Sequence, residues 1–284
     1  MKNKVGLICE GGGTKGAYTS GALKALVDYD MIFPYCVGIS AGAENLLPYV
    51  SKQRERFAIT GIGSASNKGA VGIRPLIKEH GLFGIEETCR YIEEHAPLDY
   101  QAFYESETQL DIGLYDIEAG KVVYFSKEHL NEEQVLVKAA CALLMLAKPY
   151  KFEGKMYMDA GLIDMIAIEQ SIRAGNDKHI FISTKEENYK RKPAPSWQIW
   201  LAKILYRKYP HVARDLKIRH LNYEKQWSKV EELVKAGKAL VLRPSADYGI
   251  SRYTTDKEKL APWFDLGYDD TVDRMEMIKK FIES

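Results

Sequence analysis

The first 52 residues repeat one pattern: a short apolar run, a turn with glycine, and a segment with apolar side chains at helical spacing. Residues 4–9 and 35–39 are the apolar runs and have the length of buried strands. Residues 14–29 and 41–52 have the helical spacing. Strands that alternate with helices predict a parallel sheet covered by helices. We therefore expect an α/β fold with a mainly parallel central sheet flanked by helices.

The rest of the chain divides into a continuation of this pattern and a helical tail. Residues 54–109 carry several glycines and predict a loop-rich insertion. Residues 190–195 predict a linker, so we expect an α/β domain over residues 1–185 and a mainly helical extension, packed on it, over residues 186–284. The other expected elements are a hairpin of residues 109–115 and 121–125, helices over 132–147 and 163–174, and strands at 155–158, 179–183 and 239–242.

Charge and cysteine content narrow the function classes. The formal net charge of the 284 residues is +1, which gives no global field for nucleic acid. Cys9, Cys36 and Cys141 lie in apolar runs and predict buried thiols, so we expect a cytoplasmic protein. The first residues lack the apolar core of a secretion signal, and the longest uncharged apolar stretch, residues 139–147, is shorter than the ~20 residues of a spanning helix.

A glycine-rich loop separates the first expected strand from the first expected helix. Successive glycines let backbone N–H groups turn toward one point beside a helix N-terminus, which suits a phosphate or the oxyanion of acyl transfer. The loop also satisfies G-x-G-x-x-G, the dinucleotide-binding pattern, but not the P-loop pattern. A tight turn without a ligand is a third interpretation. The loop residues are Gly11, Gly12, Gly13, Thr14, Lys15 and Gly16.

The second turn favours acyl transfer. The strand at residues 35–39 runs into Gly38, Ser40 and Gly42 in the pattern G-x-S-x-G, which is typical of a nucleophile elbow. A dinucleotide fold would carry an acidic residue at the end of this strand, and none is present. Ser40 is therefore the candidate nucleophile.

A serine nucleophile needs a base to accept its proton. None of the six histidines follows a strand in a catalytic-type turn. Asp159 follows an apolar strand-like run and opens a turn, which makes it the best placed carboxylate, although the same position suits a helix N-cap.

These three motifs, in this order, resemble the patatin-like phospholipases over about residues 4–185. The resemblance implies a Ser40–Asp159 dyad, an oxyanion hole formed by the N–H groups of the glycine-rich loop, and neither metal nor cofactor. The pattern VLRPS at residues 241–245 looks like the bacterial branch of the family, with a helical tail.

The chain departs from the family pattern at three places. Ala160 stands where the family has glycine after the aspartate, and its methyl group is costly if that position needs a positive φ. Glu44 lies one turn after Ser40, where the family has small or apolar residues; it could repel the oxyanion, act as a second base or point away. Residues 141–145 lack the usual serine and proline.

The tail suggests contact with a lipid surface. Residues 185–219 contain ten Lys or Arg against three Asp or Glu, with tryptophans and aliphatic residues between them. This pattern over residues 197–219 fits an interfacial helix at the inner membrane face, and equally an amphipathic helix packed on the core. No motif supports nucleic-acid binding.

Three functions compete. The leading one is a lipid acyl hydrolase, which cleaves a phospholipid or another acyl ester. The second is a catalytically impaired lipid- or acyl-binding regulator on the same fold, suggested by Ala160 and Glu44. The third is a nucleotide-binding protein that uses the glycine-rich loop.

Overall fold

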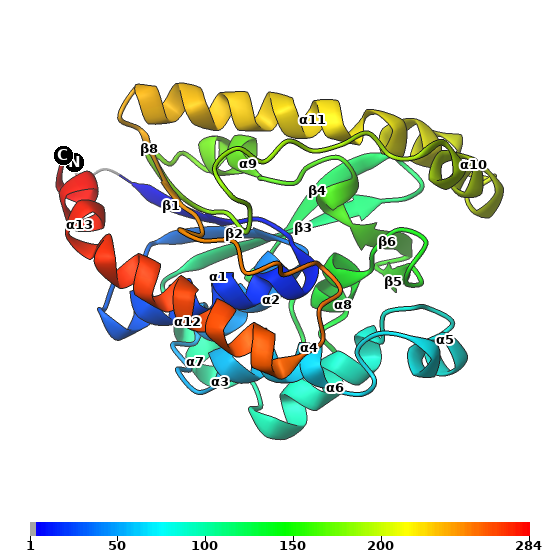
Figure 1. The fold of residues 1–284 in the computed structure, drawn as a ribbon, viewed down its shortest axis with the longest axis horizontal. Helices are drawn as coiled ribbons and strands as arrows, with labels where there is room; N and C mark the ends of the chain where they lie inside the picture. The colour runs from blue at the N-terminus through cyan, green and yellow to red at the C-terminus, as the bar shows by residue number, and fades with distance from the viewer. Residues whose placement is uncertain (1–3) are drawn as a thin grey trace.

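The computed structural model describes residues 4–284. Within them, eight strands form one sheet in the order β5-β6-β3-β2-β1-β7-β8, with β4 beside β3 (Figure 1). The pairings β1–β2, β1–β7, β2–β3 and β7–β8 are parallel, which confirms the expected mainly parallel sheet. The strands are β1 (Val5–Cys9), β2 (Tyr35–Ile39), β3 (Gln109–Asp116), β4 (Lys121–Ser126), β5 (Tyr150–Phe152), β6 (Lys155–Asp159), β7 (Lys178–Ile182) and β8 (Ala239–Leu242).

Helices cover both faces of this sheet. In Figure 1, α9 and α11 lie along one face, and α1, α2 and α12 along the other. The longer helices are α1 (Gly16–Asp28), α2 (Ala41–Val50), α5 (Ile73–Glu79), α6 (Ile85–His95), α7 (Tyr100–Glu105), α8 (Val135–Cys141), α9 (Ile168–Arg173), α10 (Ser196–Leu205), α11 (Pro210–Lys235), α12 (Lys257–Asp273) and α13 (Met275–Glu283). The short ones are η1 (Gly13–Lys15), α3 (Arg56–Ala58), η2 (Ile59–Gly63), α4 (Ser64–Ser66), η3 (Lys127–His129) and η4 (Ala160–Leu162).

The central strands are buried on both faces because helices cover both. Side chains alternate along β1, so Leu7 and Cys9 join the core that contains Trp263, whereas Ile8 joins the core that contains Tyr223. The parallel strands β1 and β2 end at one edge of the sheet, where ligands usually bind in open α/β sheets. Both the glycine-rich loop and Ser40 follow these strand ends.

The C-terminal region completes the sheet and one helical layer. β8 pairs with β7 in parallel register, and α12 packs along α1. The two helices approach closely at glycines: a Cβ at Gly267 would lie 2.1 Å from the Tyr18 carbonyl oxygen, and one at Gly21 would lie 1.9 Å from the Phe264 carbonyl oxygen. Among residues 4–284, no helix combines the length and apolar content needed to cross a bilayer.

Three predicted segments differ from the structure. Residues 54–109 are mostly helical rather than loop-rich. Gly61 lies within η2, where its backbone packs against Ser20 of α1, and Gly69 and Gly72 lie in the connection between α4 and α5. The helix expected over residues 132–147 is α8, and it ends at Cys141. The helix expected over residues 163–174 begins only at Ile168. In these two segments Met145 and Ala167 have a positive φ, which is incompatible with a continuing helix.

Candidate active site

Ser40 lies in a strained turn between β2 and α2. Its φ of 56° and ψ of −133° are unusual for a residue with a side chain. The flanking glycines allow this turn: a Cβ at Gly38 would lie 2.5 Å from the Ala43 Cα, and one at Gly42 would lie 2.4 Å from the Cys9 carbonyl oxygen. The G-x-S-x-G spacing therefore follows from steric contact, and the conformation is that of a nucleophile elbow.

Asp159 ends β6 and lines the same cavity as Ser40. Its Oδ1 accepts a hydrogen bond of 2.7 Å from the Gly161 N–H, so it also caps η4. Burial raises the pKa of Asp159 above its ordinary value, against the opposing effects of the Gly161 N–H, the Ser40 hydroxyl, Arg219 and Arg252. A buried carboxylate with a raised pKa is suited to accept a proton.

Ala160 does not need a positive φ at this site. The turn after Asp159 is the short helix η4, and Ala160 is absent from the residues with positive φ between positions 4 and 284. Its methyl group is fully buried against the β2–β3 part of the sheet. The departure from the family glycine therefore carries no backbone penalty here.

The glycine-rich loop offers some of its N–H groups and uses others internally. The Thr14 N–H donates to the Arg252 carbonyl oxygen and the Lys15 N–H to the Gly12 carbonyl oxygen, both at 3.3 Å. The Gly16 N–H donates within η1. In the part of the chain that the structure describes, the N–H groups of Gly12 and Gly13 have no backbone acceptor. Ala41, which the sequence analysis did not select, begins α2, and its N–H also lacks an intrahelical partner.

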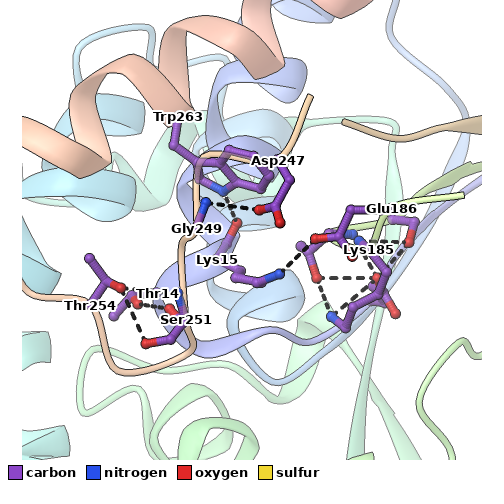
Figure 2. Close-up of polar contacts among 12 residues, drawn as sticks. Thr14, Lys15, Lys185, Glu186, Asp247, Gly249, Ser251, Thr254 and Trp263 are labelled. Atoms are coloured by element: carbon purple, nitrogen blue, oxygen red, sulfur yellow. Dashed lines mark hydrogen bonds and ion pairs between the residues drawn. The ribbon is translucent and has the colours of Figure 1, made fainter. Parts of the chain in front are cut away.

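The C-terminal region holds this loop in place, as Figure 2 shows. The indole Nε1 of Trp263 donates to the Lys15 carbonyl oxygen at 2.9 Å, and the Thr14 hydroxyl donates to the Ser251 carbonyl oxygen at 3.0 Å. The Lys15 ammonium pairs with Glu186 at 3.2 Å. The loop is therefore positioned by residues more than 170 positions away along the chain.

Glu10 is a second anchor that the sequence analysis missed. It is buried directly before the glycines, and its Oε1 accepts from the Ser183 hydroxyl at 2.7 Å and from the Thr184 N–H at 2.6 Å. Lys185 forms an ion pair with it at 3.4 Å. The sequence feature that could have indicated its role is a carboxylate at the end of an apolar strand, a place where charged residues are rare.

Two cavities meet at Ser40. One is mainly apolar and extends past Glu44 toward Cys89 and Cys141; the other is basic and contains Asp159. Gly13, Ser40 and Leu143 line both. Among the described residues that line the two cavities there is no histidine, and the carboxylates there are Glu44 and Asp159.

Glu44 lies in the wall of the apolar cavity, one helical turn after Ser40. Burial raises its pKa to about 7, and the positive charge of Arg56 opposes this only in part. The carboxyl group is thus largely neutral at slightly acidic pH, so its repulsion of an oxyanion is weak there.

Comparison with known proteins finds two family models that match parts of the chain. A sequence model of the family described as patatin-like phospholipase matches residues 7–172, and one described as a domain of unknown function (DUF6363) matches residues 209–283. No curated protein matches.

Similar solved structures include VipD from Legionella pneumophila, at 14% identity and a TM-score of 0.50, over 98% of this chain and 67% of that one. Another is human GIVD cytosolic phospholipase A2, solved with methyl gamma-linolenyl fluorophosphonate and terbium chloride. It shares 11% identity at a TM-score of 0.46, over 99% of this chain and 59% of that one. The likeness to VipD supports the fold.

Proposed function

Because the chain belongs to the patatin-like phospholipase family, we propose that this lipid hydrolase cleaves acyl esters of phospholipids through a Ser40–Asp159 dyad. The observation that carries the proposal is the strained turn at Ser40, which opens into the cavity that also contains Asp159. The family membership supports lipid hydrolysis in general, and the dyad is our assignment from the geometry.

The proposed reaction proceeds in two steps. Asp159 accepts the hydroxyl proton as the Ser40 Oγ attacks the ester carbonyl carbon, and the tetrahedral oxyanion is stabilised by the N–H groups of Gly12, Gly13 and Ala41. The leaving alkoxide takes the proton from Asp159, which leaves an acyl-enzyme. Water then attacks the acyl-enzyme with Asp159 again as base, and the released Ser40 hydroxyl is restored.

Hydrolysis of p-nitrophenyl butyrate tests the dyad. We expect Ser40→Ala and Asp159→Asn each to lower kcat by about 10²-fold or more, because each removes a group that acts in the transition state. Ser126→Ala, a serine outside both cavities, is the matched control.

Rapid labelling of Ser40 by a fluorophosphonate separates the hydrolase from the non-catalytic lipid-binding regulator. An inert parent protein that is not labelled would favour the regulator.

We also propose that α10 contacts a lipid surface. Trp197, Trp200 and Leu205 are 61%, 64% and 55% exposed, so this face of α10 is not packed on the core. Lys203 is exposed on α10 and Lys208 is exposed in the turn after it, and their charges match an anionic surface. We further propose a cytoplasmic protein that lies in part at the inner membrane face. The exposed face of α10 and the buried thiols of Cys9, Cys36 and Cys89 support this proposal, and cell fractionation tests it.

A further inference from the structure

Three arginines converge on the basic cavity beside Ser40. Arg191 comes from the segment after β7, Arg219 from α11, and Arg252 from the segment before α12. All three line the cavity that contains Ser40 and Asp159, and they also line the adjoining hollow at residues 189–198. These residues are called the arginine cluster below.

The arginine cluster is only partly neutralised by the protein, through the longer-range charge of Asp159 in the same cavity. Across residues 4–284 no carboxylate lies within ion-pair distance of the three guanidinium groups, whereas the lysines of the same cavity, Lys15 and Lys185, are each paired with a glutamate. Arg219 donates to the Gly161 carbonyl oxygen at 2.6 Å. The Nε of Arg191 is buried without a hydrogen-bond partner within the described chain.

Crowding of like charges makes this arrangement costly for the folded protein. The pKa of Arg219 is lowered to about 9, mainly by burial and in addition by the charges of Arg191 and Arg252, against the opposing effect of Asp159. The Arg191 guanidinium is held 4.9 Å from the Tyr223 ring centroid, which fixes its direction without removing its charge. Cations that are held together without ion-pair partners are typical of an anion-binding site.

We propose that the arginine cluster binds the phosphate group of an anionic glycerophospholipid whose scissile ester lies at Ser40. The inference rests on the proposed function, because it uses the same nucleophile. The acyl chain would occupy the apolar cavity on the other side of Ser40, so the two cavities fix the direction of the substrate.

The charge balance points to a phosphate monoester. Three guanidinium groups and the carboxylate of Asp159 leave an excess of two positive charges, which equals the charge of a phosphate monoester dianion. Asp159 is the single carboxylate among the described residues of this cavity, so a choline or ethanolamine cation finds no separate partner. We therefore expect phosphatidic acid to be preferred over zwitterionic lipids.

Monomeric substrates test this preference without a membrane surface. Hydrolysis of dihexanoyl phosphatidic acid, dihexanoyl phosphatidylcholine and p-nitrophenyl butyrate is compared below micellar concentrations. We expect kcat/KM to be at least about tenfold higher for phosphatidic acid than for phosphatidylcholine, since charge-assisted hydrogen bonds contribute on this scale.

Arg191→Gln and Arg252→Gln should each raise KM for phosphatidic acid about tenfold, more than for the neutral ester. Arg252→Lys should retain part of the preference, and Arg173→Gln, an exposed arginine of α9, is the control.

The outcomes are distinguishable. Equal rates on the two phospholipids, or equal losses on all three substrates in the variants, would overturn the headgroup assignment while the esterase remained. If the parent protein does not hydrolyse p-nitrophenyl butyrate, this result would instead count against the dyad. In that case a binding measurement tests the headgroup assignment. Dihexanoyl phosphatidic acid should raise the Tm of the Ser40→Ala variant and should not raise the Tm of the double variant Ser40→Ala with Arg252→Gln. If inorganic phosphate alone gives this shift and phosphatidic acid does not, the cluster serves free phosphate and the lipid assignment is wrong.

Discussion

Ser40 and Asp159 are both largely removed from water, and their surroundings set what each can do. Burial alone would favour the neutral form of Asp159, which cannot accept a proton. The Gly161 N–H and the charges of Arg219 and Arg252 counteract this by stabilising the carboxylate. Arg219 also holds the Gly161 carbonyl oxygen, so it positions the turn that holds Asp159. The same arginines would thus serve the base and the substrate phosphate.

The titration of Glu44 makes the free energy of unfolding depend on pH. Its pKa is raised to about 7 in the folded protein by burial, whereas an unfolded chain has the ordinary glutamate value near 4.5. Between these values the folded state binds more protons than the unfolded state, so the free energy of unfolding decreases as pH rises through this window. Glu44→Gln removes the titration. We expect the variant to gain stability relative to the parent between pH 4.5 and pH 7.5, by up to about 3 kcal/mol.

Urea denaturation of the two proteins across this pH range measures the difference. Glu133→Gln, which replaces an exposed carboxylate, is the control and should follow the parent. A stability difference that is constant with pH, or one that grows toward acid, would contradict a buried Glu44 with a raised pKa.

At the scale of elements, the crossing of α1 and α12 links stability to the site. Gly267 lets the backbones touch, and one turn earlier Trp263 holds the Lys15 carbonyl oxygen. In an exposed helix Gly→Ala stabilises by about 1 kcal/mol. Here the added methyl group would lie 2.1 Å from the Tyr18 carbonyl oxygen, so we expect Gly267→Ala to destabilise by about 1–3 kcal/mol. The midpoint of urea denaturation measures this.

The control for this crossing is Asp265→Ala on the exposed side of α12. It adds helix propensity without a new contact and should leave stability unchanged or slightly higher. Equal effects of the two substitutions would show that the helices can separate at little cost.

Elements with strong local patterns were predictable from the sequence. The strands β1 and β2 and the turns after them are continuous apolar runs followed by glycines, so the fold class and the position of Ser40 followed from residues close together in the chain. Helices α3 to α7 were not, because the glycines of this stretch favour loops. Gly61 nevertheless lies within η2, where it packs against Ser20 of α1, a contact that no local pattern reveals. The residues of the site divide in the same way into those that a local pattern predicts and those that it does not. Glu10 and Trp263 act through contacts with residues far away in the sequence, and the members of the arginine cluster lie far apart along the chain, so local patterns do not reveal these roles.

At the scale of the whole molecule, two exposed apolar helix faces lie toward one end. α5 and α10 are found at the same end of the molecule in Figure 1, and α13 lies at the opposite end. α5 exposes Ile73 and Ile77, at 75% and 71%, and α10 exposes Trp197 and Trp200. Exposed apolar groups gathered at one end, with lysines and arginines among them, favour a lipid surface as the partner of this end.

Vesicle binding tests this orientation. We expect Trp197→Ala with Trp200→Ala to weaken partitioning into vesicles of phosphatidylcholine and phosphatidylglycerol by about tenfold or more, since burial of each indole in the interface contributes at least 1 kcal/mol on the scale of large apolar side chains. Both side chains are more than half exposed, so the Tm should change little. Met277→Ala on α13, which is 48% exposed at the other end, is the matched control and should bind as the parent does. Equal binding of all three proteins would mean that α10 does not meet the bilayer, and that its tryptophans face another partner.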